Sequence, residues 1–169
     1  KSKYLPKIAD GSAIHTYAIT EPNGRWDREG IAMKAAASGS DFVLNGTKLF
    51  VPDAHVADYL QVVAWKPDGR LSTFIVPRDQ AGVSVTVLKT IASDKQAEVT
   101  FKDVKVAAAD VIDMDDKAAA KLRNMATNLE CAYLVGLAQR DFEISVNYAK
   151  ERVQFGRPIG SFQAIQHKA

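Results

Sequence analysis

The stretch NYAKERVQFGRPIGSFQAIQHKA, residues 147–169, carries the most informative pattern in the chain. It predicts the end of one long helix, a tight break and the start of the next helix. Gly156 tolerates the left-handed conformation that closes a helix, and Pro158 two residues later cannot continue one. Ser161 is then expected to be the N-cap of a helix that runs from Phe162 onward.

This break brings two polar side chains to one corner of the fold. Arg152 is expected on the last turn of the first helix, and Gln163 in the first turn of the second. A guanidinium with an amide close by, next to a helix N-terminus, suits an anionic group such as a pyrophosphate. The alternative is an ordinary interhelical corner, with Arg152 solvated at a helix C-terminus where the dipole favours it. The physical argument alone favours the ordinary corner.

The full motif is Tyr148-Ala149-x-x-Arg152-x-Gln154-Phe155-Gly156-x-Pro158-Ile159-x-x-Phe162-Gln163. It resembles the signature of the acyl-CoA dehydrogenase family, in which the matching Arg and Gln, eleven positions apart, hold the FAD of a neighbouring subunit. The resemblance implies that Arg152, Phe155 and Gln163 reach the adenosine pyrophosphate of an FAD bound by another subunit. It therefore implies an oligomer, either a homo-oligomer (dimer or tetramer) or a hetero-oligomer.

The composition is that of a soluble globular protein, with 169 residues, 47% hydrophobic and 25% charged. A net charge of +2 gives no electrostatic case for nucleic acid or an anionic membrane. No apolar run approaches the ~18 residues of a membrane span. The single Cys131 excludes an internal disulfide, and we expect an inert buried thiol in a reducing compartment. We expect a bacterial-like cytoplasmic location. Both ends look cut, so an organellar location stays open.

Residues 13–112 follow mostly strand patterns. Asn45-Gly46 between two apolar runs, in residues 42–51, predicts a type I′ hairpin. A second hairpin is expected around residues 66–70. The remaining strands are expected at 14–20, 31–37, 83–88, 97–101 and 104–106. Seven or so short strands predict a sandwich or barrel.

The period changes to helical spacing near Met114 and stays helical to about Arg152. Apolar residues form two stripes on this helix, so it must pack into a bundle or a subunit interface. We expect residues 1–113 to form a middle β-domain with a short lead-in, and residues 114–169 to be the truncated start of a C-terminal helical domain. The predicted fold class is α+β, an antiparallel β-barrel or sandwich followed by the first helices of an α-helical bundle. The family has this layout.

Thr20-Glu21-Pro22 extends the resemblance, because the family has Tyr/Phe-x-x-Thr-Glu-Pro followed by two variable residues and Gly-Ser-Asp. It implies flavin contacts from Tyr17, Ile19 and Thr20. If Asp27 is the family's Asp, Arg25 and Trp26 replace Gly and Ser. Arg25 could supply phosphate affinity through its charge. Trp26 could contact the cofactor or the substrate, or fill the space that a flavin or CoA chain needs.

Phe50-Val51-Pro52 falls where the family has an aromatic, an aliphatic and a Ser or Thr whose hydroxyl bonds the flavin N5. The resemblance implies that all three residues contact the cofactor, although Pro52 supplies neither a hydroxyl nor an amide proton. On the long helix, Thr127 stands where the family often has an Arg that holds acyl-CoA. Arg123, one turn earlier, is a possible substitute.

We assign no catalytic residue to this chain. The family's base is a Glu in the C-terminal part, outside this sequence, and the minority position on the long helix is Ala126 here. Glu21 and Glu130 are expected to be structural. His15, His55 and His167 lack metal-ligand spacing, so we expect no metal site.

The resemblance implies an FAD-dependent enzyme that dehydrogenates an acyl-CoA thioester at its α,β bond, with hydride transfer to flavin N5. Its implied partners are acyl-CoA and an electron-transferring flavoprotein. Two alternatives stay open. One is a non-catalytic or half-active subunit of a hetero-oligomer, and the other is a flavin oxidase or monooxygenase on the same fold.

Overall fold

The computed structural model describes residues 2–25 and 27–168. The chain divides into two compact units, Lys1–Asp116 and Lys117–Ala169. The division lies close to the 113/114 boundary expected from the change of period. Each unit is described by itself.

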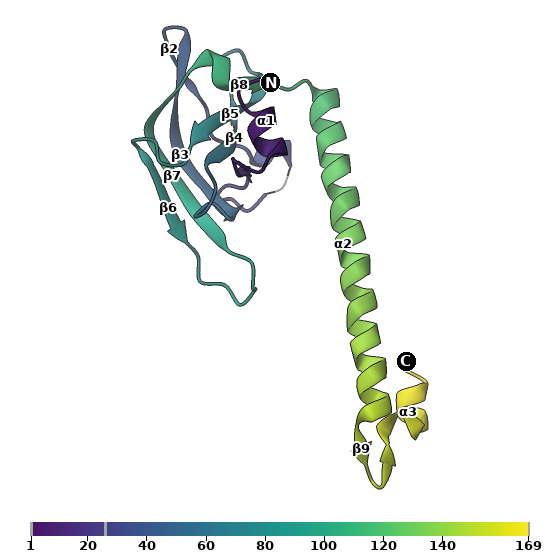
Figure 1. Ribbon diagram of the computed structural model, residues 1–169. Coiled ribbons are helices and arrows are strands. Elements are labelled where there is room, and N and C mark those ends of the chain that lie inside the picture. Colours follow the sequence, from purple (N-terminus) through teal and green to yellow (C-terminus); the bar gives the residue numbers. More distant parts are fainter. Residues whose placement is uncertain (1, 26, 169) are drawn as a thin grey trace. The chain divides into compact units, whose positions relative to one another are not determined.

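The first unit contains two four-stranded sheets (Figure 1). One sheet has the order β1 (His15–Ala18), β4 (Tyr59–Trp65), β5 (Leu71–Pro77), β8 (Val111–Asp113). The other has the order β2 (Ala36–Ser38), β3 (Asp41–Pro52), β7 (Gln96–Val106), β6 (Val83–Val87). All neighbours pair antiparallel except β1 and β4, which are parallel. The α+β fold class is confirmed, with two open sheets and no closed barrel in the described residues.

The unit also has three short helical segments: α1 (Leu5–Ala9) precedes β1, η1 (Arg28–Gly30) lies between β1 and β2, and η2 (Ala108–Asp110) lies between β7 and β8. The apolar core lies between the sheets, where Leu44 of β3, Leu60 of β4 and Val99 of β7 are fully buried. Phe42 meets Phe74 edge to face, with ring centroids 5.5 Å apart. Burial of these alternating side chains is the main favourable contribution to folding of the unit.

The predicted hairpin at Asn45-Gly46 is wrong, because β3 runs straight through both residues. The register against β7 shifts between Leu44 and Gly46, which marks a β-bulge. The Asn45 amide bonds the neighbouring strand instead of closing a turn: its Nδ2 donates to Asp103 Oδ1 at 3.1 Å, and its Oδ1 accepts from Asp103 N at 2.8 Å. Glycine is favoured at position 46 by its φ of 137°; an added Cβ would also lie 2.9 Å from the methyl group of Met33, the end of a flexible side chain.

A second register shift, between Lys48 and Val51, changes which side chains of β3 face the core. Lys48 and Val51 are both buried although three positions separate them, whereas strict alternation would bury Phe50. Phe50 takes φ 54° and is 49% exposed. The bulge therefore turns an aromatic ring to the surface, at the cost of a left-handed conformation that an aromatic residue rarely adopts.

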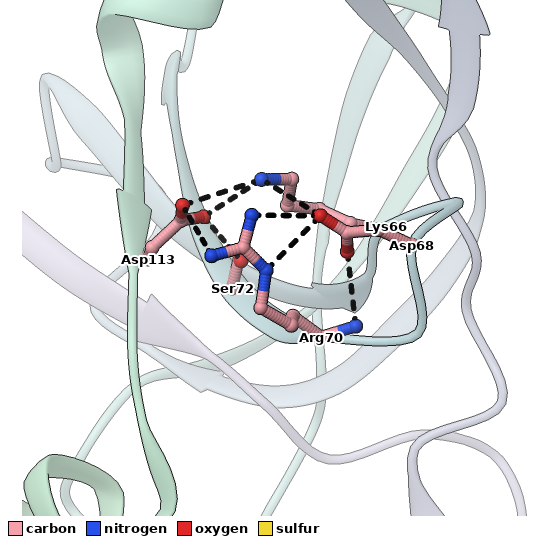
Figure 2. A network of polar contacts seen from close by, with 5 residues as sticks. All are labelled: Lys66, Asp68, Arg70, Ser72 and Asp113. Carbon is pink, nitrogen blue, oxygen red and sulfur yellow. Dashed lines mark hydrogen bonds and ion pairs between the residues drawn. The ribbon is translucent and has the colours of Figure 1, made fainter.

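A polar network joins the turn between β4 and β5 to β8 (Figure 2). Lys66 Nζ donates to Asp113 Oδ1 at 3.0 Å, and the Ser72 hydroxyl donates to the same oxygen at 2.9 Å. Arg70 Nη2 donates to Asp68 at 2.8 Å, and hydrogen bonds from Arg70 lower the pKa of Asp68 to about 2. The network fastens β8, the last strand of this unit, to the β4–β5 hairpin.

The second unit begins with the helix α2 (Asp116–Glu151), in which no described residue is buried. Large apolar side chains are exposed along it, including Leu129, Tyr133 and Val135 at 66–71%. Cys131 is exposed too, so the expectation of a buried thiol is wrong. Even this 36-residue helix is not apolar enough to cross a membrane, and neither is any other helix of the described residues.

After α2 the chain forms the short strands β9 (Val153–Gln154) and β10 (Arg157–Pro158), then η3 (Ile159–Ser161) and α3 (Gln163–Gln166). β9 and β10 pair antiparallel around Phe155 and Gly156. The break after the long helix is therefore a two-residue hairpin.

Because of the bulge, we expect glycine to be more stable than alanine at position 50, the reverse of the order in an ordinary strand. In an ordinary strand Gly is less stable than Ala by roughly 0.5–1 kcal/mol. A left-handed conformation costs a residue with a Cβ about 1–2 kcal/mol. We expect Phe50→Gly to be more stable than Phe50→Ala by about 1 kcal/mol in urea unfolding.

Tryptophan fluorescence suits this measurement because both tryptophans, Trp26 and Trp65, belong to the first unit. Thr47 is the control position, because it lies on the same strand as Phe50 and pairs in register with Thr100 of β7. There the Ala variant should be the more stable one. Equal stability of the two Phe50 variants would contradict a strained residue 50.

Candidate functional site

Two stretches far apart in sequence lie side by side at one edge of the β unit. The Thr16 hydroxyl donates to Pro52 O at 2.5 Å, and Leu49 N donates to Thr20 O at 2.8 Å. Residues 16–20 therefore run antiparallel to residues 49–52. The side chains of Ile19, Thr20, Phe50 and Pro52, none of them buried, make up what we call the β1–β3 strip.

The other residues predicted beside the strip do not expose their side chains to the same degree. Val51 is 1% exposed and belongs to the core, so only its backbone can meet a ligand. Tyr17 is half-buried on β1; burial raises the pKa of its phenol, against a smaller opposing effect of the Thr73 hydroxyl. Within the strip, the only polar group of Pro52 is its carbonyl, which already accepts the Thr16 hydroxyl.

Beneath the strip lies a buried ion pair that the sequence analysis missed. Lys48 Nζ donates to Glu21 Oε1 at 2.7 Å and to Ile19 O at 3.0 Å. The Glu21 carboxylate also accepts from Ala32 N at 2.8 Å and Met33 N at 3.0 Å. Glu21 is thus a structural carboxylate, as expected. A lysine at an inward position of a predicted strand, with an acid in the adjoining loop, is the sequence signal that points to such a pair.

The two charges respond to burial in different ways. Burial raises the pKa of Glu21, but the Lys48 ammonium and the two backbone N–H groups lower it further, so its pKa lies below the ordinary value of 4.5. Burial lowers the pKa of Lys48, against the attraction of Glu21. Because the carboxylate accepts three donors, we assign the pair as charged at neutral pH.

The loop after Glu21 holds the residues predicted to contact substrate. Arg25 Nε donates to Asp27 Oδ1 at 2.8 Å, and its Nη2 bonds the other oxygen of the same carboxylate. Glu29 lies 3.7 Å from that Nη2. A phosphate at Arg25 must therefore compete with two carboxylates. Trp26 lies outside the described residues.

The corner after α2 presents the other predicted set. Arg152 directly follows the helix; its N donates to Tyr148 O, and its carbonyl accepts from Ile159 N, both at 2.8 Å. Phe155 and Gly156 have φ 56° and 76°, the pair of positive values that a type I′ turn needs. Gly156 is left-handed as predicted, but it closes this hairpin and not the helix.

The second helix of the corner also differs from expectation. Phe162, and not Ser161, is the N-cap of α3, and the Ser161 hydroxyl donates to Pro158 O at 2.8 Å within η3. With four residues, α3 is too short for the macrodipole to favour an anion. Gln163 does lie in its first turn, as expected. Any anion affinity must come from the side chains.

Those side chains are exposed and close to an aromatic cluster. Phe155 is 91% exposed and meets Phe162 edge to face at 6.1 Å. The Arg157 guanidinium lies 4.1 Å from the centre of the Phe162 ring. Arg152 and Gln163 are exposed as well. The corner therefore exposes a guanidinium, a carboxamide and an apolar ring.

The remaining candidates form no hydrogen bond or ion pair between side chains within the described part of the chain. Thr127, Arg123, Ala126 and Glu130 are exposed on α2. No group of three His, Cys, Asp or Glu in residues 2–25 and 27–168 is arranged to hold a metal ion.

Comparison with known proteins identifies both units. Residues 16–104 match the family described as "Acyl-CoA dehydrogenase, middle domain", and residues 117–169 match "Acyl-CoA dehydrogenase, C-terminal domain". The relative "Probable acyl-CoA dehydrogenase YngJ" of Bacillus subtilis (strain 168) is 35% identical over 99% of this chain and 47% of its own length. An "Acryloyl-CoA reductase (NADH)" of Anaerotignum propionicum is 31% identical over 98% of this chain and 45% of its own.

Among solved structures, glutaryl-CoA dehydrogenase from Mycobacterium smegmatis in complex with FADH2 superposes with a TM-score of 0.91 at 26% identity. The superposition covers 99% of this chain and 45% of that one. The chain thus spans about half the length of the curated relatives it matches.

The buried pair predicts a steep loss of stability in acid. The folded-state pKa of Glu21 lies below 4.5, so its contribution is complete above that pH and is lost as pH falls toward the folded value. Glu21→Gln should flatten the fall in unfolding free energy between pH 5 and pH 3, as followed by tryptophan fluorescence. At pH 7 it should cost about 3–5 kcal/mol, because Lys48 is left buried and unpaired.

Glu98→Gln is the matched control, since this half-buried carboxylate on β7 forms no ion pair with another described residue. It should keep the wild-type slope. A wild-type slope in Glu21→Gln would contradict the assigned charge state.

Proposed function

Because the chain belongs to the acyl-CoA dehydrogenase family, as its motifs predicted, we propose that the protein carrying it uses FAD to oxidise an acyl-CoA thioester to the 2,3-enoyl product. The observation that carries the proposal is the joint presence of the β1–β3 strip and the Arg152–Gln163 corner. One suits a flat ring, and the other suits a pyrophosphate.

The strip fits one face of a flavin ring. Ile19 and Phe50 are 43% and 49% exposed although both are large and apolar, and Thr20, next to Ile19 in the chain, adds a hydroxyl to the strip. Apolar side chains of this kind pack against an aromatic ring system and exclude water from it. The FAD, when bound, supplies the hydride acceptor.

The corner fits the other end of the cofactor. Arg152 can bind a phosphate with two parallel N–H donors, Gln163 can donate from its amide, and Phe155 can cover the adenosine. By the family pattern these groups reach the FAD of another subunit, so the proposal requires an oligomer. Its further partners are the acyl-CoA and an electron-transferring flavoprotein.

Neither glutamate considered in the sequence analysis is assigned as the base that removes the α-proton. Glu21 is held by Lys48 and two backbone donors, and Glu130 lies on the open surface of α2. No acid of this chain matches the position of the base in the family pattern, so the proposal takes the base from outside this sequence. The role of this chain is to bind and orient the cofactor.

A second candidate is the partner-subunit alternative, in which the chain lends Arg152 and Gln163 to another subunit's flavin without completing a site of its own. Pro52, whose carbonyl is already bonded to Thr16, and Arg25, which is paired with Asp27, favour it.

The test is the flavin content of the complete protein. We expect a yellow protein that bleaches anaerobically when an acyl-CoA is added. Arg152→Ala should weaken FAD binding roughly tenfold or more, the size expected for loss of a hydrogen bond to a charged group. Gln163→Ala should weaken it about fivefold, as for a neutral bond.

Arg140→Ala is the matched control, because this exposed arginine of α2 pairs only with Glu143, at 3.6 Å, among the described ion pairs. It should bind FAD like the wild type. A colourless protein after reconstitution with FAD would contradict the proposal. Flavin in half of the chains of a hetero-assembly would favour the second candidate.

A further inference from the structure

Lys48 and Glu21 form an ion pair with an unusual location. Their side chains are 0% and 7% exposed, whereas every other ion pair within residues 2–25 and 27–168 has at least one partner exposed by more than 40%. Taking two charges out of water costs more than their attraction usually returns, so a buried pair is weak support for stability. We therefore consider which segments of the chain the Lys48–Glu21 pair holds in position.

The pair ties three segments together. Lys48 belongs to β3, Glu21 to the loop after β1, and the N–H groups of Ala32 and Met33 to the segment before β2. The ammonium also bonds Ile19 O at 3.0 Å. One lysine thus holds the loop through both a carboxylate and a backbone carbonyl.

The β1–β3 strip lies directly on these bonds. Ile19 O is bonded to Lys48, Thr20 O to Leu49 N, and Pro52 O to Thr16. Phe50 sits between them at φ 54°, and the register shift that exposes it starts at Lys48. A strained residue persists only where its surroundings over-determine it, and here the surroundings include the lysine.

We propose that Lys48 and Glu21 are positioning residues for the flavin-facing strip, holding Ile19–Thr20 and Phe50–Pro52 at one fixed spacing. The inference rests on the proposed function. The pair touches no cofactor itself; it acts through the Ile19 carbonyl and through the bulge of β3. Loosening it should alter the surroundings of the flavin ring without removing any side chain of the strip.

The test separates positioning from folding. Lys48→Met alone leaves a buried carboxylate and is expected to unfold easily. The double variant Lys48→Met/Glu21→Gln removes both charges, keeps an amide oxygen for Ala32 N or Met33 N, and should stay folded by tryptophan fluorescence. It still lacks the donor to Ile19 O. Lys66→Met, which removes the lysine of the exposed network at Asp113, is the matched control.

In the complete protein we expect the Leu49 amide of the double variant to exchange hydrogen about tenfold faster than in the wild type, the factor for one lost bond to a charged group. The Lys102 amide, bonded to Gly82 O away from the pair, is the internal reference and should not change. The visible absorption maximum of bound FAD should shift, with binding several-fold weaker. Lys66→Met should match the wild type in all three readouts.

The outcomes are distinguishable. A yellow double variant with unchanged Leu49 exchange and an unchanged flavin spectrum would overturn this inference alone. A wild type that binds no FAD would overturn the proposed function and this inference with it.

Discussion

The register shift between Lys48 and Val51 is the constraint on which the surface of the β unit depends. Without it, β3 would bury Phe50 and expose Val51, and no aromatic ring would stand beside Ile19 and Thr20. The shift has a cost, a left-handed aromatic residue. The Lys48 bonds, the Thr16–Pro52 bond and the Leu49–Thr20 bond hold that residue in place.

The second unit differs from the first in that its long helix has no core of its own. No described residue of α2 is buried, and large apolar side chains such as Leu129 and Val135 are exposed along it. Helices in proteins gain most of their stability from tertiary packing of an apolar face, so we expect these side chains to be packing surfaces. The corner after it is specified locally. A two-residue hairpin reverses the chain, and Gly160 packs so closely on α2 that an added Cβ would lie 2.9 Å from Ala149 O. Arg152 and Gln163 are presented by a compact turn, whatever covers the helix.

Much of the fold could be predicted from periodicity. The turn of the β4–β5 hairpin lies at residues 66–70 as expected, and the long helix begins and ends within two residues of its expected ends, because alternation and helical spacing extend over many positions there. The predicted hairpin at Asn45-Gly46 was wrong because the turn signal is local, whereas the pairing of β3 with β7 extends along the whole strand. The prediction of Ser161 as an N-cap was wrong because a 3₁₀ turn, η3, lies between the hairpin and α3.

The candidate site was predictable where a family motif names the residues and not where packing decides. The motif points to Thr20, Phe50, Arg152 and Gln163, but no spacing rule reveals that Val51 faces the core. The orientation of Val51 follows from the bulge, which inserts one residue into an otherwise regular alternation.

A crystal structure of the complete, FAD-loaded oligomer is the most direct test of the central claim. The account predicts that Ile19, Thr20 and Phe50 of one subunit contact the flavin ring, while Arg152 and Gln163 of another subunit bind the pyrophosphate of the same FAD. Arg152 and Gln163 pointing into solvent, with the flavin bound elsewhere or absent, would contradict it.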